Sequence, residues 1–272
     1  MQCVTRAGCT LRGFGTALAF AVCVLGGTAR GADAVVDVWA AASLREPVSQ
    51  LARRFEAQAQ GRKINLVFGA SNALARQIQS GAPADVFLSA DDVSVDRLQA
   101  AGFVRPETRR VFASNRLVIV AARELTVPLA GPSDLLRPEV KRIALAAPEV
   151  PLGRYAREWL AARGLAEAVK ARTVVLGDAV ATLASVDSGN AEAGIVYLTD
   201  ARTAKSARIA FSVPAAEQPY IVYVGAVMQG GDQPDLADEF LRLLVSQDGW
   251  AVLRAAGFLP PPPTIAPSPD AP

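Results

Sequence analysis

Histidine is absent from the 272 residues of this sequence, and its three cysteines all lie within the first 23 residues. Without histidine the chain lacks the commonest general base, the commonest metal ligand and the Ser-His-Asp and Cys-His catalytic arrangements. Without later cysteines it also lacks disulfides, thiol catalysis and thiolate metal sites beyond that segment. Dinucleotide-binding glycine motifs and phosphate-loop lysine motifs are missing as well. These absences favour a binding protein over an enzyme.

The N-terminal segment has the form of a secretory signal peptide. Two arginines precede an apolar run at 14–25, and small residues follow, which places cleavage after Gly31 or Ala32. The run is too short for a membrane span, and no later stretch reaches the required ~20 apolar residues. Residues 1–31 hold three arginines and no acid, so 28 basic and 26 acidic residues become 25 and 26. The slight basicity therefore gives no argument for nucleic-acid binding.

The rest of the chain alternates between strand-like and helix-like segments. Short apolar runs predict strands, and apolar residues at helical spacing between them predict helices, which is typical of a mostly parallel α/β protein. After Phe258 the sequence is dominated by proline, so residues 259–272 are expected to form an extended, disordered tail. The predicted strands lie at 35–40, 64–68, 86–88, 115–120, 143–146, 174–176, 193–197, 209–213 and 220–227.

A strand–helix–strand unit occupies residues 64–88. The apolar run 64–68 breaks at Gly69, Ser71 begins a helical pattern, and another buried strand follows at 86–88. Ser71 is thus predicted at a helix N-terminus beside the carboxyl end of a strand, the edge at which ligands bind in open α/β sheets. The free N–H groups and partial positive charge of a helix N-terminus suit an anion. The alternative is that Ser71 only caps its helix.

Other turns offer neutral hydrogen-bond donors of the same kind. Ser43 follows the first strand and has capping-box spacing to Glu46, so capping alone is again an alternative. The backbone at Leu152-Gly153 and at Asp178-Ala179 opens two more helices, and Tyr197 ends a strand. Hydroxyls and helix N-termini without metal ligands suit a small, fully ionised oxyanion, because their dipoles are fixed and need no reorganisation.

These motifs, in this order, resemble the periplasmic molybdate-binding proteins of ABC transporters. The resemblance covers residues 35–258, and its most specific part joins the segment around Ser71 to Gly81-Ala82-Pro83-Ala84-Asp85. The other matching segments are Ala41-Ala42-Ser43-Leu44, residues 69–78, Asn115-Arg116-Leu117-Val118, residues 148–156 and residues 194–201.

The resemblance implies a two-lobed type II periplasmic-binding-protein fold. This α/β fold has mixed, mostly parallel sheets with helices on both faces and a ligand cleft between the lobes. Lobe 1 would comprise residues 33–113 and 203–258, and lobe 2 residues 114–202. The chain would cross between the lobes twice and hold the anion in the cleft.

The resemblance also implies the ligand and the residues that bind it. Ser43 and Ser71 would donate hydroxyl and backbone N–H bonds from one lobe, Leu152 and Ala179 backbone N–H bonds from the other, and Tyr197 its hydroxyl. The ligand would be molybdate or tungstate, bound as an oxyanion without direct metal ligands and without a cofactor. The protein would act in the periplasm as a monomer that delivers this anion to a membrane permease, with no nucleic-acid partner.

Two positions depart from the family pattern. Leu152 stands where the family often has alanine, after a loop shorter by one residue, and Ala179 stands where it often has valine. Both contacts involve the backbone, so the side-chain changes are tolerable. Asp85 and Asp178 are expected to be structural acids that accept from nearby N–H groups.

Other functions remain open at this point. The ligand could be sulfate, thiosulfate or phosphate, since no sequence feature measures the cavity. An exported hydrolase with Ser71 or Ser43 as its nucleophile would lack a histidine base and a Ser-x-x-Lys spacing. A sensory role, in which the closed lobes signal to a partner, is a further alternative.

Overall fold

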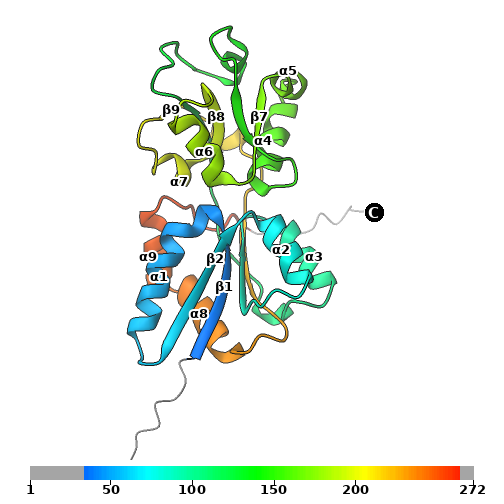
Figure 1. Ribbon diagram of the computed structural model, residues 1–272, viewed down its shortest axis with the longest axis vertical. Helices are drawn as coiled ribbons and strands as arrows, with labels where there is room; N and C mark the ends of the chain where they lie inside the picture. The colour runs from blue at the N-terminus through cyan, green and yellow to red at the C-terminus, as the bar shows by residue number, and fades with distance from the viewer. Residues whose placement is uncertain (1–33, 264–272) are drawn as a thin grey trace, which may run out of the picture. The chain divides into compact units, whose positions relative to one another are not determined.

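The computed structural model describes residues 34–263, which form two five-stranded sheets flanked by helices (Figure 1). Each sheet with its helices is one lobe. The predicted signal peptide, residues 1–31, lies outside the described residues. Within the described part, no helix has the length and apolar character needed to cross a membrane.

Lobe 1 is built on the strands β1 (Ala34–Ala41), β2 (Arg62–Gly69), β3 (Val86–Ser89), β4 (Arg110–Ala113) and β10 (Tyr223–Val227). Their order in the sheet is β2-β1-β3-β10-β4. The first three strands run parallel to one another, whereas β10 is antiparallel to both of its neighbours.

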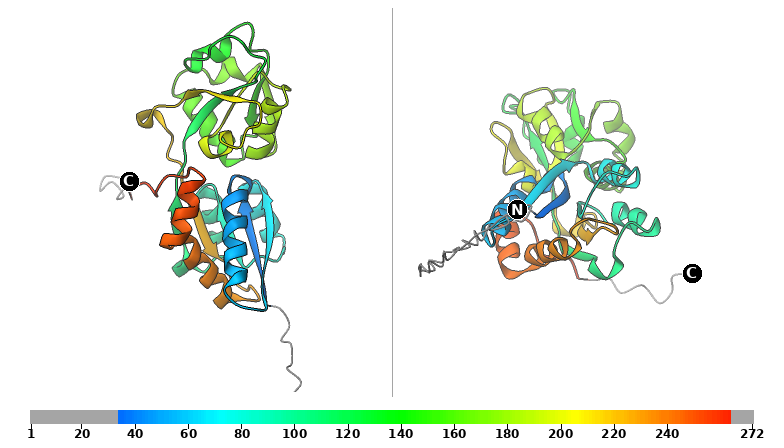
Figure 2. Two further views of the ribbon diagram at one scale, coloured as in Figure 1. Left: turned by 90° about the vertical axis from the view of Figure 1, so that its left-hand side faces the viewer. Right: turned by 60° about the horizontal axis from the view of Figure 1, so that its bottom comes forward.

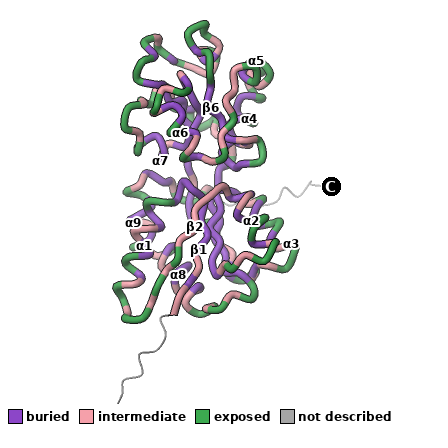
Figure 3. The backbone as a smooth tube through the Cα atoms, in the orientation of Figure 1, coloured by how far each residue is buried: buried purple, intermediate pink, exposed green. Residues whose placement is uncertain are grey.

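Alternating side chains on the central strands bury both faces of this sheet. Val38 and Ala40 belong to the core beneath α1 (Arg45–Ala57), α8 (Pro234–Val245) and α9 (Gln247–Ala255). Trp39 lies between them in sequence and packs on the opposite face, against α2 (Ser71–Gln79) and α3 (Val93–Ala100). Successive strand residues point to opposite faces, so one strand supports two helix layers. Figure 2 shows these layers, and Figure 3 shows the buried strands between them.

Lobe 2 repeats this arrangement with the strands β5 (Leu117–Ala121), β6 (Ile143–Ala146), β7 (Thr173–Leu176), β8 (Ala193–Tyr197) and β9 (Arg208–Ser212). Their order is β7-β6-β8-β5-β9. One face is covered by α4 (Pro151–Ala161) and α5 (Ala166–Lys170), and the other by α6 (Ala179–Asp187) and α7 (Leu198–Ala201).

Both sheets are mixed, with two parallel and two antiparallel pairings in each among the described residues. The parallel pairings come from strand–helix–strand units, as the sequence predicts. The antiparallel pairings involve β5 and β10, which the chain enters directly from the other lobe. β10 starts at the edge of the lobe 1 sheet where β1, β2 and β3 end, and β5 starts at the edge of the lobe 2 sheet where β6 and β8 end. Each of the two strands therefore runs in the opposite direction to those neighbours.

The lobe boundary expected at residue 203 is wrong. β9 pairs with β5 in the sheet of lobe 2, so the chain returns to lobe 1 within residues 213–222, and the other crossing is at 114–116. β9 is an edge strand whose residues are exposed or half-buried. Its pattern therefore indicates a strand but does not show which sheet it joins.

The folded region also extends one residue further than predicted. Leu259, expected to begin the disordered tail, exchanges two backbone hydrogen bonds with Ser114, of 2.8 and 2.9 Å. Beside it Phe258 is buried and contacts the ring of Tyr223 edge-on, with the ring centroids 5.1 Å apart. The end of the folded chain is thus attached to the first crossing between the lobes.

Candidate oxyanion site

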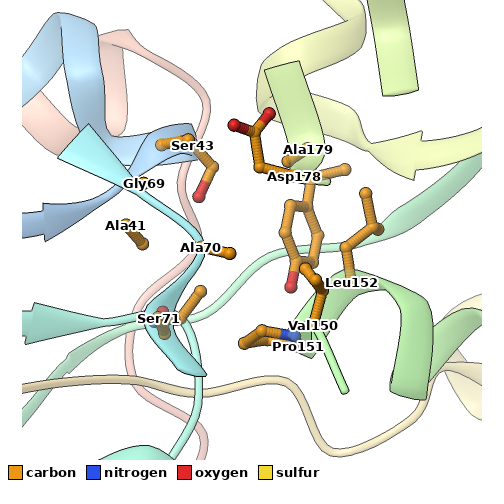
Figure 4. A pocket seen from close by; sticks show the side chains of 13 residues that line it. Ala41, Ser43, Gly69, Ala70, Ser71, Val150, Pro151, Leu152, Asp178 and Ala179 are labelled. Atoms are coloured by element: carbon orange, nitrogen blue, oxygen red, sulfur yellow. The ribbon is translucent and has the colours of Figure 1, made fainter. Parts of the chain in front are cut away.

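All five predicted site residues line one cavity between the two lobes. The space between the surrounding atoms amounts to about 230 Å³, which includes the part open to solvent. Figure 4 shows the side chains from both lobes around it. The lining consists of Ala41, Ala42, Ser43, Gly69, Ala70, Ser71, Ala90, Val150, Pro151, Leu152, Asp178, Ala179 and Tyr197.

Ser43 lies in a short 3-10 helix, Ala42–Leu44, that leads directly into α1. The capping-box interpretation of Ser43 and Glu46 is wrong, because neither the 3-10 helix nor α1 has a side-chain cap hydrogen bond. The Ser43 Oγ instead lies 3.0 Å from the Tyr223 hydroxyl, a contact within lobe 1. Small residues before it, Ala41 and Ala42, leave the space beside the helix start open to the cavity.

Ser71 is the first residue of α2, and its side chain does not cap this helix either. Its Oγ accepts a hydrogen bond of 3.0 Å from the backbone N–H of Ala90, which follows β3. This bond uses a lone pair of the hydroxyl and leaves its proton free to donate. Because Ser71 is almost fully buried at the cavity wall, that proton is available to a ligand there.

Leu152 presents its backbone at the start of α4. Pro151 is the first residue of the helix, so the N–H of Leu152 lies in the first turn and has no carbonyl one turn earlier to bond. Glycine at position 153 allows this helix to begin close to the end of β6. Any larger residue would clash there, because its Cβ would lie 2.0 Å from the Ala147 carbonyl oxygen. Leu152 therefore lines the cavity, while Gly153 contacts the sheet.

Ala179 occupies the matching position at the start of α6. Asp178 caps this helix by accepting a 2.8 Å hydrogen bond from the Ala181 N–H, so its predicted structural role is confirmed. Asp85 is likewise a structural acid, because it accepts from the N–H groups of Asp37 at 2.8 Å and Gln233 at 3.3 Å. The first-turn N–H of Ala179 remains beside the cavity.

Tyr197 ends β8 and is 1% exposed. Within the described residues its hydroxyl has no hydrogen-bond partner. Burial raises the pKa of this hydroxyl well above its ordinary value, so it remains a protonated donor. A buried donor without a partner costs free energy, which a ligand that accepts its hydrogen bond would recover.

The cavity wall, as far as the described residues show, contains no lysine or arginine. Arg154 is one helical position beyond Gly153, but its Nη1 lies 2.9 Å from Asp91 Oδ2 and so pairs with a carboxylate of the other lobe. The second oxygen of Asp91 accepts from the Ser89 hydroxyl and the Ser94 N–H. Sequence reasoning missed this contact between the lobes, because nothing local relates residue 91 to residue 154.

The site thus combines hydroxyl donors with the N-termini of helices from both lobes. Among the described residues no group of three or more His, Cys, Asp or Glu side chains could hold a metal ion. Fixed neutral dipoles at a small cavity can stabilise a compact anion without a counter-cation. Two lobes joined by two crossings, with such a cavity between them, define a two-lobed solute-binding protein.

Comparison with known proteins leads to the same class. Residues 36–259 match the family of bacterial extracellular solute-binding proteins. The molybdate-binding protein ModA of Mycobacterium tuberculosis is 33% identical over 235 residues, covering 86% of this chain and 88% of that protein. ModA of Escherichia coli is 33% identical, covering 90% and 95%. The structure of the Azotobacter vinelandii periplasmic molybdate-binding protein superposes with a TM-score of 0.76 at 26% identity, covering 84% and 100%.

This chain therefore belongs to the bacterial extracellular solute-binding proteins. Its relatives are binding proteins and not enzymes, so the hydrolase alternative is discarded. The hydroxyls of Ser43 and Ser71 are accordingly considered as hydrogen-bond donors and not as nucleophiles.

Proposed function

We propose that this protein captures molybdate, and also tungstate, and delivers it to the membrane permease of an ABC transporter. The observation that carries the proposal is the convergence of Ser43, Ser71, Leu152, Ala179 and Tyr197 on one small cavity without a cationic wall residue. Relatives that are about one-third identical over most of the chain are named molybdate-binding proteins, which supports the same ligand.

The binding mode follows from the donors available. Each of the two serines supplies a hydroxyl, Tyr197 a phenol, and the helix starts supply backbone N–H groups. All of these groups donate, which suits the oxygens of a fully ionised dianion. Molybdate and tungstate have nearly the same size and shape, so both fit such a site. Sulfate is smaller and would be rejected by the distance between donors.

The remaining parts of the proposal concern the setting. Residues 1–31 would direct export to the periplasm, where the protein acts as a monomer without a cofactor and without a nucleic-acid partner. The family membership and the short N-terminal apolar run support this location.

The proposal is tested by thermal unfolding of the purified protein with molybdate, tungstate, sulfate or phosphate. A ligand at 1,000 times its Kd that binds only the folded state adds about 4.1 kcal/mol of stability. Increases in melting temperature with molybdate and tungstate but not with sulfate or phosphate are expected. An increase with sulfate alone would keep the binding class but overturn the ligand, and no increase with any anion would refute the site.

A further inference from the structure

Among the candidate ligand-binding residues, Ser43 has a hydroxyl that could either donate or accept in its hydrogen bond to the protein. Its Oγ lies 3.0 Å from the Tyr223 hydroxyl, and either oxygen could donate in that pair. If Ser43 donated to Tyr223, it would present only lone pairs to the cavity and would repel an anion. The direction of this single hydrogen bond therefore decides whether Ser43 contributes to binding.

Asn115 removes the ambiguity from the other side of the tyrosine. Its Oδ1 accepts a 2.9 Å hydrogen bond from the Arg116 N–H, which can only donate, so the amide orientation is determined. Its Nδ2 then donates both protons, to the Thr199 Oγ1 at 2.8 Å and to the Tyr223 hydroxyl at 3.2 Å. The tyrosine oxygen is thus an acceptor from Asn115.

The proton of Tyr223 must therefore go to Ser43. Tyr223 is fully buried, and among the described residues its hydroxyl has these two partners. Leaving its proton unbonded in the core would cost about 1–3 kcal/mol, whereas donation to Ser43 Oγ satisfies it. Burial raises the pKa of the Tyr223 hydroxyl above its ordinary value, so the proton stays in place.

We propose that Asn115 and Tyr223 are positioning residues that force the Ser43 hydroxyl to donate into the anion cavity. The Asn115 amide donates a hydrogen bond to Tyr223, Tyr223 donates to Ser43, and Ser43 donates to the ligand. Asn115 lies in the crossing at 114–116 and Tyr223 follows the crossing at 213–222, so residues at both connections between the lobes determine this donor. The inference rests on the proposed function and names residues that do not line the cavity.

Substitution of Tyr223 by phenylalanine tests the link to Ser43. Calorimetric titration with molybdate is carried out on the full-length wild type, S43A, Y223F and S43A/Y223F proteins. Y223F removes the hydrogen bond that holds the Ser43 hydroxyl in its donating orientation, so it should weaken binding by up to about tenfold and should cause no further loss in the S43A background. The matched control is Tyr220→Phe in the same crossing, whose side chain is 45% exposed and which should bind as the wild type does.

Asn115→Asp provides a second, isosteric test that reverses the direction. The carboxylate can only accept, so Tyr223 would donate to it and Ser43 would have to donate to Tyr223. The new charge also repels the anion, but that effect persists in the S43A background, whereas the loss of the Ser43 donor does not. N115D should therefore cost at least about tenfold more affinity with Ser43 present than in the S43A background.

The outcomes separate this inference from the proposed function. Equal losses in both backgrounds for Y223F and N115D, or wild-type affinity in both variants, would overturn the positioning role while leaving molybdate binding intact. A wild-type protein that binds neither molybdate nor tungstate would overturn both proposals. Melting temperatures of the ligand-free variants show whether each protein is folded, and the dependence on Ser43 is a result that a purely structural role would not produce.

Discussion

Tyr197→Phe is expected to change stability and binding in opposite directions. The substitution removes one oxygen atom, which is buried in the cavity wall and has no hydrogen-bond partner within the described residues. An unsatisfied buried polar group costs about 1–3 kcal/mol, so its removal should stabilise the ligand-free protein by up to that amount. For a protein of this size each kcal/mol corresponds to roughly 2–4 °C in melting temperature.

The hydroxyl of Tyr197 should contribute to binding once an anion occupies the cavity, because it can then donate a hydrogen bond. A hydrogen bond to a charged group contributes about 1.5–3 kcal/mol, which corresponds to a loss of roughly tenfold to 150-fold in molybdate affinity. The two quantities are measured separately, by urea unfolding without ligand and by calorimetric titration. Tyr220→Phe is the control, since its exposed hydroxyl should affect neither quantity.

Two results would refute this reasoning. Unchanged molybdate affinity in Tyr197→Phe would mean that this hydroxyl does not contact the ligand. Reduced stability without ligand would mean that the hydroxyl has a partner in solution, contrary to its environment here. Either result would remove the explanation of Tyr197 as a donor kept unpaired for the anion.

Further predictions concern four other positions. Ser71→Ala should weaken molybdate binding by about 1.5–3 kcal/mol and also lower the melting temperature, because a buried backbone N–H loses its acceptor; unchanged calorimetric affinity would exclude Ser71 as a ligand. Arg154→Met removes the ion pair with Asp91 between the lobes and should therefore weaken molybdate binding, whereas unchanged affinity in calorimetric titration would show that binding does not need this contact. Burial, with a smaller contribution from a neighbouring carboxylate, raises the pKa of Asp200 from 3.8 to about 7, so stability that its neutral form provides at low pH is lost as the pH rises through 7. Asp200→Asn should flatten urea-unfolding stability between pH 5 and 8 and raise it at pH 8 by up to roughly 4 kcal/mol, whereas parallel pH profiles would contradict the shift. Truncation after Leu259 should leave affinity and melting temperature unchanged, whereas truncation before it should lower the melting temperature by removing two backbone hydrogen bonds.

Local patterns were sufficient for much of the fold and for the candidate site. The turn from an apolar strand through Gly69 to a helix starting at Ser71 depends on residues adjacent in sequence, and the structure contains this unit. The role of Asp178 as the acceptor of a nearby N–H group was predictable for the same reason, whereas Asp85 accepts from Asp37 and Gln233, which are distant in sequence. The five site residues came from matching such local motifs to a family, and the structure brings all five to one cavity.

Non-local partners explain where the sequence interpretation failed. The spacing of Ser43 and Glu46 is that of a capping box, yet Ser43 bonds Tyr223, 180 residues away in sequence. β9 has the pattern of a strand, but its assignment to lobe 2 depends on pairing with β5. Strand spacing likewise did not show that β5 and β10 run antiparallel to their neighbours.

The sequence by itself determined the class of elements, the helix starts that offer free N–H groups, and the absence of histidine and thiol chemistry. Those properties depend on each residue and its near neighbours. The tertiary structure alone decided that Arg154 pairs with Asp91 across the lobes, that Tyr197 is left without a partner, and that Asn115 and Tyr223 orient Ser43. The direction of a buried hydrogen bond depends on every donor and acceptor around it, and folding brings these together from distant parts of the chain.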